Sequence, residues 1–136
     1  MVIPEPWALV FRALGVPADA VIAVPNFGLD LYRLVSSDDP GPEDFEPVPA
    51  WVARKRGIPE LLRQGLSHFL TAEQADAVRT KAGSHVARVV LHRDPRIFIA
   101  RTDRDRPGHV EVWLPPDLIE HVLSTIEIVI WASIVG

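Results

Sequence analysis

The stretch Leu29–Val35, with the sequence LDLYRLV, decides the fold of the middle of the chain. β-forming side chains alternate along it and a run of turn-forming residues, 36–41, follows it, which together predict a β-strand. Because successive side chains of a strand point to opposite faces, Tyr32 and Leu34 share one face and Arg33 lies on the other, among apolar neighbours. An arginine buried without a partner is costly. Arg33 is therefore either a partly exposed strand residue or a contact for an anion or a ribose.

Other segments of the chain have strand or helix character. Further strands are predicted over 21–24, 66–70, 84–91, 96–101, 109–114 and 125–135. Helices are predicted over 4–14, 49–56, 59–64, 71–82 and 117–123. The clearest helix begins at Thr71, because Thr71 and Gln74 have the spacing of a capping box, and Gly83 ends it.

The mixture of helices and strands, without regular alternation, predicts an α+β fold. We expect a single domain with a mixed, mainly antiparallel sheet and short helices. Residues 1–28 are expected to form an N-terminal helix and extension that packs on a core domain of residues 29–136.

Composition narrows the class of protein. The 136 residues suffice for one domain with a sizeable core, and 48% of them are hydrophobic. The absence of cysteine excludes disulfides, thiolate metal sites and cysteine nucleophiles, and it suits a reducing compartment, so we expect a cytoplasmic protein. A net charge of −4 argues against nucleic-acid binding. The apolar stretch 126–135 is too short to span a membrane and contains Glu127, so no membrane partner is expected.

The sequence lacks the common motifs that indicate a particular catalytic or binding function. It contains no glycine-rich phosphate loop, no G-x-S-x-G elbow and no H-E-x-x-H pair. None of the five histidines stands four residues from another, so we expect no metal site. The five are His68, His85, His92, His109 and His121.

Two further segments carry candidate site residues. Ser67 lies on a predicted strand that turns directly into the helix at Thr71, so its hydroxyl either contacts a polar ligand or satisfies the local backbone. His109 and Glu111 are two residues apart on a strand and share a face. They form either the solvent face of an ordinary strand or a site in which Glu111 stabilises developing positive charge.

In order along the chain, these segments resemble a small bacterial family known to us only by its pattern. That pattern is a Tyr-Arg strand (32–35 here), an acidic loop, a Gly-Ile-Ser segment (Gly65-Leu66-Ser67 here), an alanine-rich helix (Ala72–Ala77), and Gly-His-x-x-x-Trp (Gly108, His109 and Trp113 here). The layout is similar to the ADP-ribosyltransferase-like fold and covers residues 30–122.

The resemblance implies roles for five residues. Tyr32, Arg33, Ser67 and His109 would belong to an NAD-binding site, with Arg33 on a phosphate or ribose, and Glu111 would be the catalytic carboxylate. Two motifs depart from that fold's pattern. The usual Ser-Thr-Ser is Leu66-Ser67-His68 here, and the acid-x-Glu pair is His109-Val110-Glu111.

These departures favour a non-catalytic protein-interaction module on this scaffold; the sequence implies no cofactor with certainty, and NAD is the one that the resemblance suggests. The module would act through the N-terminal helix and the last strand, on a protein partner or as a homo-oligomer. The alternative is an NAD-dependent ADP-ribosyltransferase or NAD glycohydrolase of the toxin or effector type found in toxin-antitoxin systems.

Overall fold

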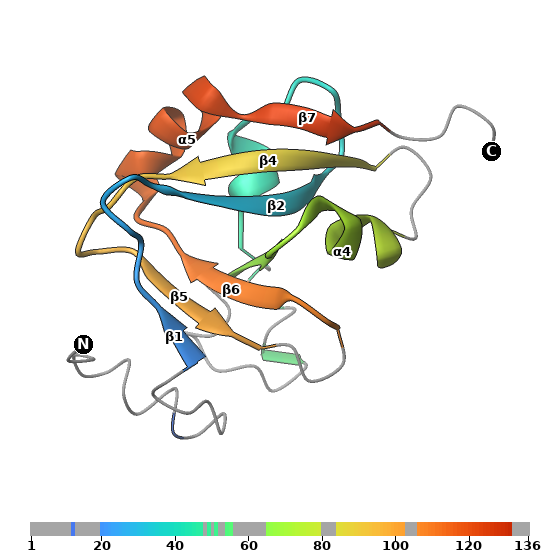
Figure 1. Ribbon diagram of the computed structural model, residues 1–136. Helices are drawn as coiled ribbons and strands as arrows, with labels where there is room; N and C mark the ends of the chain where they lie inside the picture. Colours follow the sequence, from blue (N-terminus) through green and yellow to red (C-terminus); the bar gives the residue numbers. More distant parts are fainter. Residues whose placement is uncertain are drawn as a thin grey trace.

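The strand predicted at Leu29–Val35 is β2, near the middle of an antiparallel sheet. The computed structural model describes residues 12, 20–47, 49, 51, 54–55, 65–79, 84–102 and 106–131. Within these residues, seven strands form one sheet in the order β1-β5-β6-β3-β2-β4-β7, and every adjacent pair is antiparallel (Figure 1). The α+β prediction is confirmed, with a sheet that is antiparallel in all its described pairs.

The bounds of the elements follow the sequence pattern closely. The strands are β1 Val21–Ile22, β2 Leu29–Val35, β3 Leu66–Phe69, β4 His85–Leu91, β5 Phe98–Arg101, β6 His109–Trp113 and β7 Glu127–Ile130. The helices are η2 Pro42–Phe45, α4 Ala72–Ala77, η3 Pro116–Leu118 and α5 Ile119–Thr125, where η marks a 3₁₀ turn.

Several elements differ from the prediction, and β1 and β5 are each two residues shorter than expected. Helix α4 is capped by the Thr71 hydroxyl as expected, but it ends at Ala77, because the Val78 and Arg79 amides donate back into a tightened last turn. The last strand starts at Glu127, since α5 continues to Thr125. The loop expected after β2 contains η2. The helix predicted over 59–64 lies wholly outside the described residues. Of the helices predicted over 4–14 and 49–56, only residues 12, 49, 51, 54 and 55 are described, and all of these except 49 are helical.

The two faces of the sheet carry separate apolar clusters. On one face, side chains from β2, β4, β5 and β6 pack with Val122 of α5 and Phe45 of η2. On the other face, Phe69 and Val86 pack with Ala75 of α4. Helix α4 and helix α5 therefore cover opposite faces, as the strand alternation predicts for β2.

The sheet consists of two parts that meet at a single register pair. The strands β1, β5, β6 and β3 form one part, and β2, β4 and β7 form the other; Figure 1 shows the two parts running at an angle to each other. Between β3 and β2 the only Cα partners are Phe69 and Tyr32. Beyond this pair β2 and β3 diverge, and the gap between them becomes the floor of a cleft.

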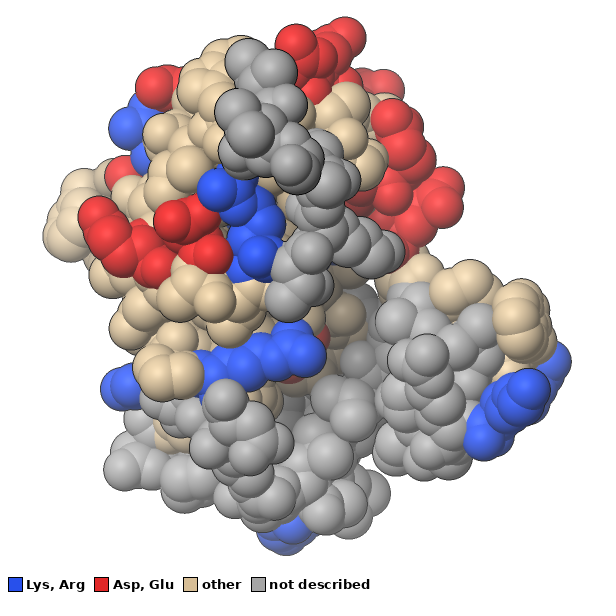
Figure 2. Space-filling view, turned by 90° about the vertical axis from the view of Figure 1, so that its right-hand side faces the viewer, with Lys and Arg blue, Asp and Glu red and all other residues tan. Residues whose placement is uncertain are grey.

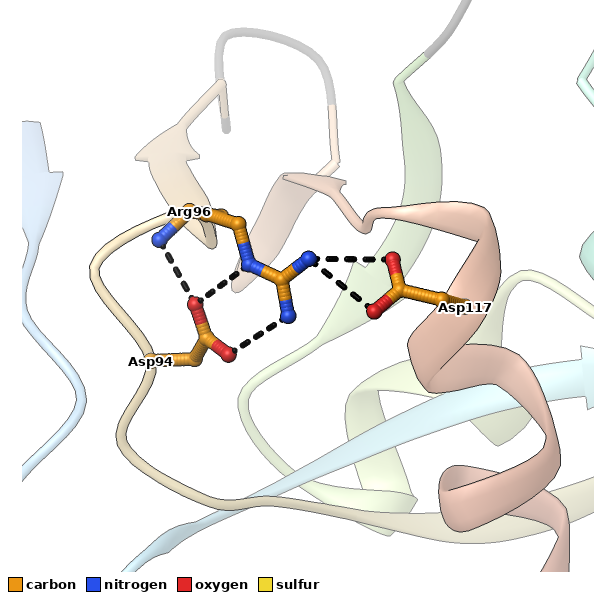
Figure 3. A network of polar contacts seen from close by, with 3 residues as sticks. All are labelled: Asp94, Arg96 and Asp117. Atoms are coloured by element: carbon orange, nitrogen blue, oxygen red, sulfur yellow. Dashed lines mark hydrogen bonds and ion pairs between the residues drawn. The ribbon is translucent and has the colours of Figure 1, made fainter.

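Two contacts hold the turns around the sheet. The carbonyl of Gly108 accepts a hydrogen bond from the Leu70 amide at 2.9 Å, and Gly108 has φ +76°, with the Gln74 side chain where a Cβ would stand. Only glycine fits this approach of the β6 turn to α4. On the far side of the sheet, Arg96 lies between Asp94 and Asp117 and joins the β4–β5 turn to η3 (Figure 3).

The importance of η2 for the core can be tested at Phe45. The ring is 2% exposed, so Phe45→Ala should lower the free energy of unfolding by about 3 kcal/mol in urea denaturation. The matched control is Phe27→Ala, because that ring is 92% exposed and its loss should change stability by less than about 0.5 kcal/mol. Equal, small effects of the two changes would contradict a structural role for η2.

Candidate functional site

Arg33 lies where β2 and β3 diverge and joins three segments. Its Nη1 donates to the Ser67 carbonyl on β3 at 2.7 Å, and its Nε donates to the Asp44 carbonyl in η2 at 2.8 Å. The guanidinium also lies over the Phe45 ring, 5.4 Å from its centroid, within cation–π range. The Arg33 side chain thus occupies the place where backbone hydrogen bonds would otherwise continue between β2 and β3.

The Asp44 side chain fixes η2 beside Arg33. Its Oδ1 accepts hydrogen bonds from the amide and hydroxyl of Ser36, and its Oδ2 accepts one from the Gly41 amide, each at 3.1 Å. The Asp44 carboxylate therefore accepts hydrogen bonds within its own loop. Asp44 contacts Arg33 through its backbone carbonyl. Among the described residues, no carboxylate lies within ion-pair distance of the Arg33 guanidinium.

Ser67, His109 and Glu111 meet on adjacent strands. Ser67 on β3 is the register partner of Glu111 on β6, and its hydroxyl favours the charged form of the Glu111 carboxyl group. The Nε2 of His109 is 3.1 Å from the Ser67 hydroxyl and 3.7 Å from Glu111 Oε1. The other ring nitrogen, Nδ1, is 2.7 Å from the hydroxyl of Thr102, which follows β5. Four polar side chains from three strands form one connected network.

Burial sets the charge states around this network. The pKa of Glu111 is raised to about 7 because burial disfavours the carboxylate, although Arg33, Arg106 and the Ser67 hydrogen bond act in the opposite direction. Burial also lowers the pKa of Arg33 to about 10, so the guanidinium stays charged at neutral pH. A buried carboxyl group that titrates near neutrality, beside a cation, is typical of functional sites.

His68 is a buried neutral residue on the opposite side of β3 from Ser67. Burial, followed by the nearby charge of Arg33, lowers its pKa to about 3. Its Nδ1 is 3.0 Å from the Leu66 carbonyl, so the ring proton resides on Nδ1 and donates to that oxygen. His68 therefore packs against Phe45 without placing a second positive charge beside Arg33.

A cleft of about 780 Å³ opens over the diverging strands. Its lining includes the end of β2, η2, Val78 and Arg106, and Ser67 is exposed on its floor. Figure 2 views this side of the molecule, and Lys and Arg side chains cross the middle of it between groups of Asp and Glu. The volume lies within the range of small-molecule sites.

The structure brings four of the five sequence-predicted site residues together. Arg33, Ser67, His109 and Glu111 lie in or directly beside the cleft. Of these four, Arg33 and Ser67 line the cleft, and His109 and Glu111 lie beside Ser67. Tyr32 is not among the lining residues and packs against the cluster of Phe69, Ala75 and Val86.

Sequence reasoning missed Asp44, Thr102 and Arg106. Arg106 is exposed at the turn before β6, lines the cleft and acts electrostatically on Glu111. Only the spacing of Thr102 and His109 across a short hairpin could have suggested their contact, since a hairpin of this length brings the two strand ends together.

The described residues contain neither a metal-binding cluster nor a membrane-spanning helix. In the part of the chain that the structure describes, no three His, Cys, Asp or Glu side chains are grouped so that they could hold a metal ion. No helix there is long and apolar enough to cross a membrane. Comparison of the chain with family models, with curated proteins and with solved structures gives no match.

The cost of the buried carboxylate can be measured as a pH-dependent stability. The folded pKa of Glu111, about 7, exceeds its usual value of 4.5, so its contribution is fully present below pH 4.5 and is lost as the pH rises through 7. Glu111→Gln should therefore gain stability relative to the unchanged protein between pH 5 and pH 8, by up to about 3 kcal/mol. Urea denaturation at both pH values measures the gain.

Glu127→Gln is the matched control, because Glu127 is exposed on β7 and pairs with Arg88 at the surface. The difference in stability between Glu127→Gln and the unchanged protein should be the same at pH 5 and at pH 8. Parallel pH dependences for Glu111→Gln and the unchanged protein would show that Glu111 does not titrate near neutrality.

Proposed function

We propose that the cleft binds NAD and that the site cleaves the bond between nicotinamide and ribose, with transfer of ADP-ribose to water or to another acceptor. The observation that carries the proposal is that Arg33 and Ser67 line one cleft and Glu111 lies beside Ser67, the three residues coming from three neighbouring strands. The same three residues are those that the resemblance to ADP-ribosyltransferases singles out.

Cleavage of the nicotinamide–ribose bond is favoured by a carboxylate beside the cation that develops on the ribose. As the C–N bond breaks, its electron pair leaves with nicotinamide and the ribose acquires oxocarbenium character. A lone pair of the acceptor then forms the new bond to the same carbon, and the acceptor gives up a proton. Ionised Glu111 would stabilise the cationic stage strongly, because a largely buried charge acts through a low dielectric.

The two arginines suit the anionic half of the ligand. Arg33 is charged, donates its hydrogen bonds to neutral carbonyl groups and lines the cleft. The guanidinium of Arg106 makes no hydrogen bond or ion pair with a described residue. Arginine binds phosphate through charge-assisted, often bidentate hydrogen bonds, so the pair provides donors for a pyrophosphate.

Loss of nicotinamide release in Glu111→Gln is the direct test. We expect the rate to fall at least about 100-fold, since one electrostatic contact to the transition state is removed. In the unchanged protein the rate should rise with pH through about 7, as Glu111 ionises. Glu127→Gln should retain full activity, and equal rates for the two variants would remove Glu111 from the mechanism.

The non-catalytic interaction module remains a second candidate, and the position of β7 favours it. This strand pairs with β4 and, among the described strands, lies at the edge of the sheet. Trp131, directly after it, is 59% exposed. An edge strand with apolar residues can pair with a strand of another chain. The predicted N-terminal helix, the other contact of this hypothesis, lies outside the described residues.

Self-association through β7 predicts a mass that rises with concentration. Light scattering across a wide concentration range should then show a dimer that Val129→Lys converts to monomer, because a charge is placed on the half-buried strand. Thr125→Lys, at an exposed position just before the strand, is the control. A monomer at all concentrations would exclude the homo-oligomer.

A further inference from the structure

Thr102 is attached to His109 by two hydrogen bonds. Its hydroxyl is 2.7 Å from the imidazole Nδ1, and its amide donates to the His109 carbonyl at 3.0 Å. The hydroxyl therefore has little freedom to leave the ring. His109 itself is 8% exposed and stacks edge-on against Phe69, with the ring centroids 5.3 Å apart, so its orientation is fixed as well.

The donor and acceptor inventory gives the network a direction. An ionised carboxylate only accepts hydrogen bonds, and that of Glu111 lies 3.7 Å from His109 Nε2 and beside Ser67, its register partner. This negative charge favours the arrangement in which Nε2 carries a proton, the Ser67 oxygen accepts from Nε2 at 3.1 Å and the Ser67 hydroxyl proton is directed to Glu111. In neutral imidazole the other nitrogen is an acceptor, and the Thr102 hydroxyl is the group that donates to it.

We propose that Thr102 is a positioning residue, whose hydroxyl fixes His109 in the Nε2–H tautomer and, through Ser67, directs a hydrogen bond onto the Glu111 carboxylate. Its consequence for catalysis rests on the proposed function. The hydrogen-bond order from Thr102 to Glu111 does not, because it follows from the contacts and from the negative charge of Glu111.

Other groups also face Glu111 and set its charge. Arg33 approaches from β2 and Arg106 from the turn before β6, and both favour the carboxylate. The register partners of Glu111 on β3 and β5 are Ser67 and Ala100, which are uncharged. The Thr102 network thus adds a directional contact to a site in which the two cations supply charge but, among the described residues, no hydrogen bond to this carboxylate.

The paired variants Thr102→Val and Thr102→Ser separate a positioning role from a packing role. Valine keeps the shape of threonine and loses the hydroxyl, whereas serine keeps the hydroxyl and loses the methyl group. The ¹⁵N chemical shifts of His109, measured at pH 8 without NAD, report the tautomer directly. The ¹³C shift of the Glu111 carboxyl group, followed against pH, reports its ionisation.

We expect the unchanged protein and Thr102→Ser to show the Nε2–H tautomer. Thr102→Val should show a mixture or Nδ1–H, and its Glu111 midpoint should rise by about half to one pH unit, because the hydrogen bond that favours the carboxylate is weakened. The pH profile of nicotinamide release should shift by the same amount in Thr102→Val only, with a rate at pH 7 reduced about threefold to tenfold.

Two results would overturn the proposal. One is an Nδ1–H tautomer in the unchanged protein, which can be measured even if Thr102→Val does not fold. The other is a Thr102→Val variant that folds and keeps both the tautomer and the Glu111 midpoint. If the tautomer moves as expected but the unchanged protein releases no nicotinamide, the positioning role stands and the proposed NAD chemistry fails.

Discussion

The guanidinium of Arg33 is the contact on which the geometry of the site depends. It enters the gap where β2 and β3 diverge, takes the Ser67 carbonyl from β3 and the Asp44 carbonyl from η2, and lies against Phe45. Both bonds have a charged donor, which makes them stronger than hydrogen bonds between neutral groups. One side chain thus holds the cleft open, joins its two walls and supplies its central positive charge.

The site keeps an electrostatic arrangement that is unfavourable for stability. Glu111 is largely buried near a cation that it does not contact, and burial outweighs the attraction on its pKa. A protein selected only for stability would neutralise or pair this carboxylate. The neutral state of His68 avoids a further cost to stability, because a second cation would repel the nearby buried Arg33. Costs of this kind are typical of residues retained for function.

Much of this fold could be predicted from local sequence. The alternation in β2, the cap at Thr71 and the shared face of His109 and Glu111 depend only on periods and spacings along one element. The expected fold class followed from the order of such elements. The similarity to the ADP-ribosyltransferase-like fold remains a prediction.

The convergence of the site could not be predicted in the same way, because it depends on the order of strands in the sheet. Arg33 reaches Ser67 only because β2 and β3 are neighbours that pair at one position and then diverge. Thr102 and Asp44 act through the register of a hairpin and the shape of a loop. Tyr32 packs on the α4 face of the sheet, as the strand alternation predicts, and its role in ligand binding remains a prediction.

The two parts of the sheet also differ in how they are joined through space and along the chain. In space they share one register pair, but the chain passes from one part to the other at every step from β1 to β7 except from β5 to β6. Neither part is therefore a continuous segment, and neither can be made as a separate fragment. Because the chain crosses repeatedly between the two parts, its connecting segments limit how far β2 and β3 can separate. Their separation itself breaks few backbone hydrogen bonds, since the two strands pair at one position.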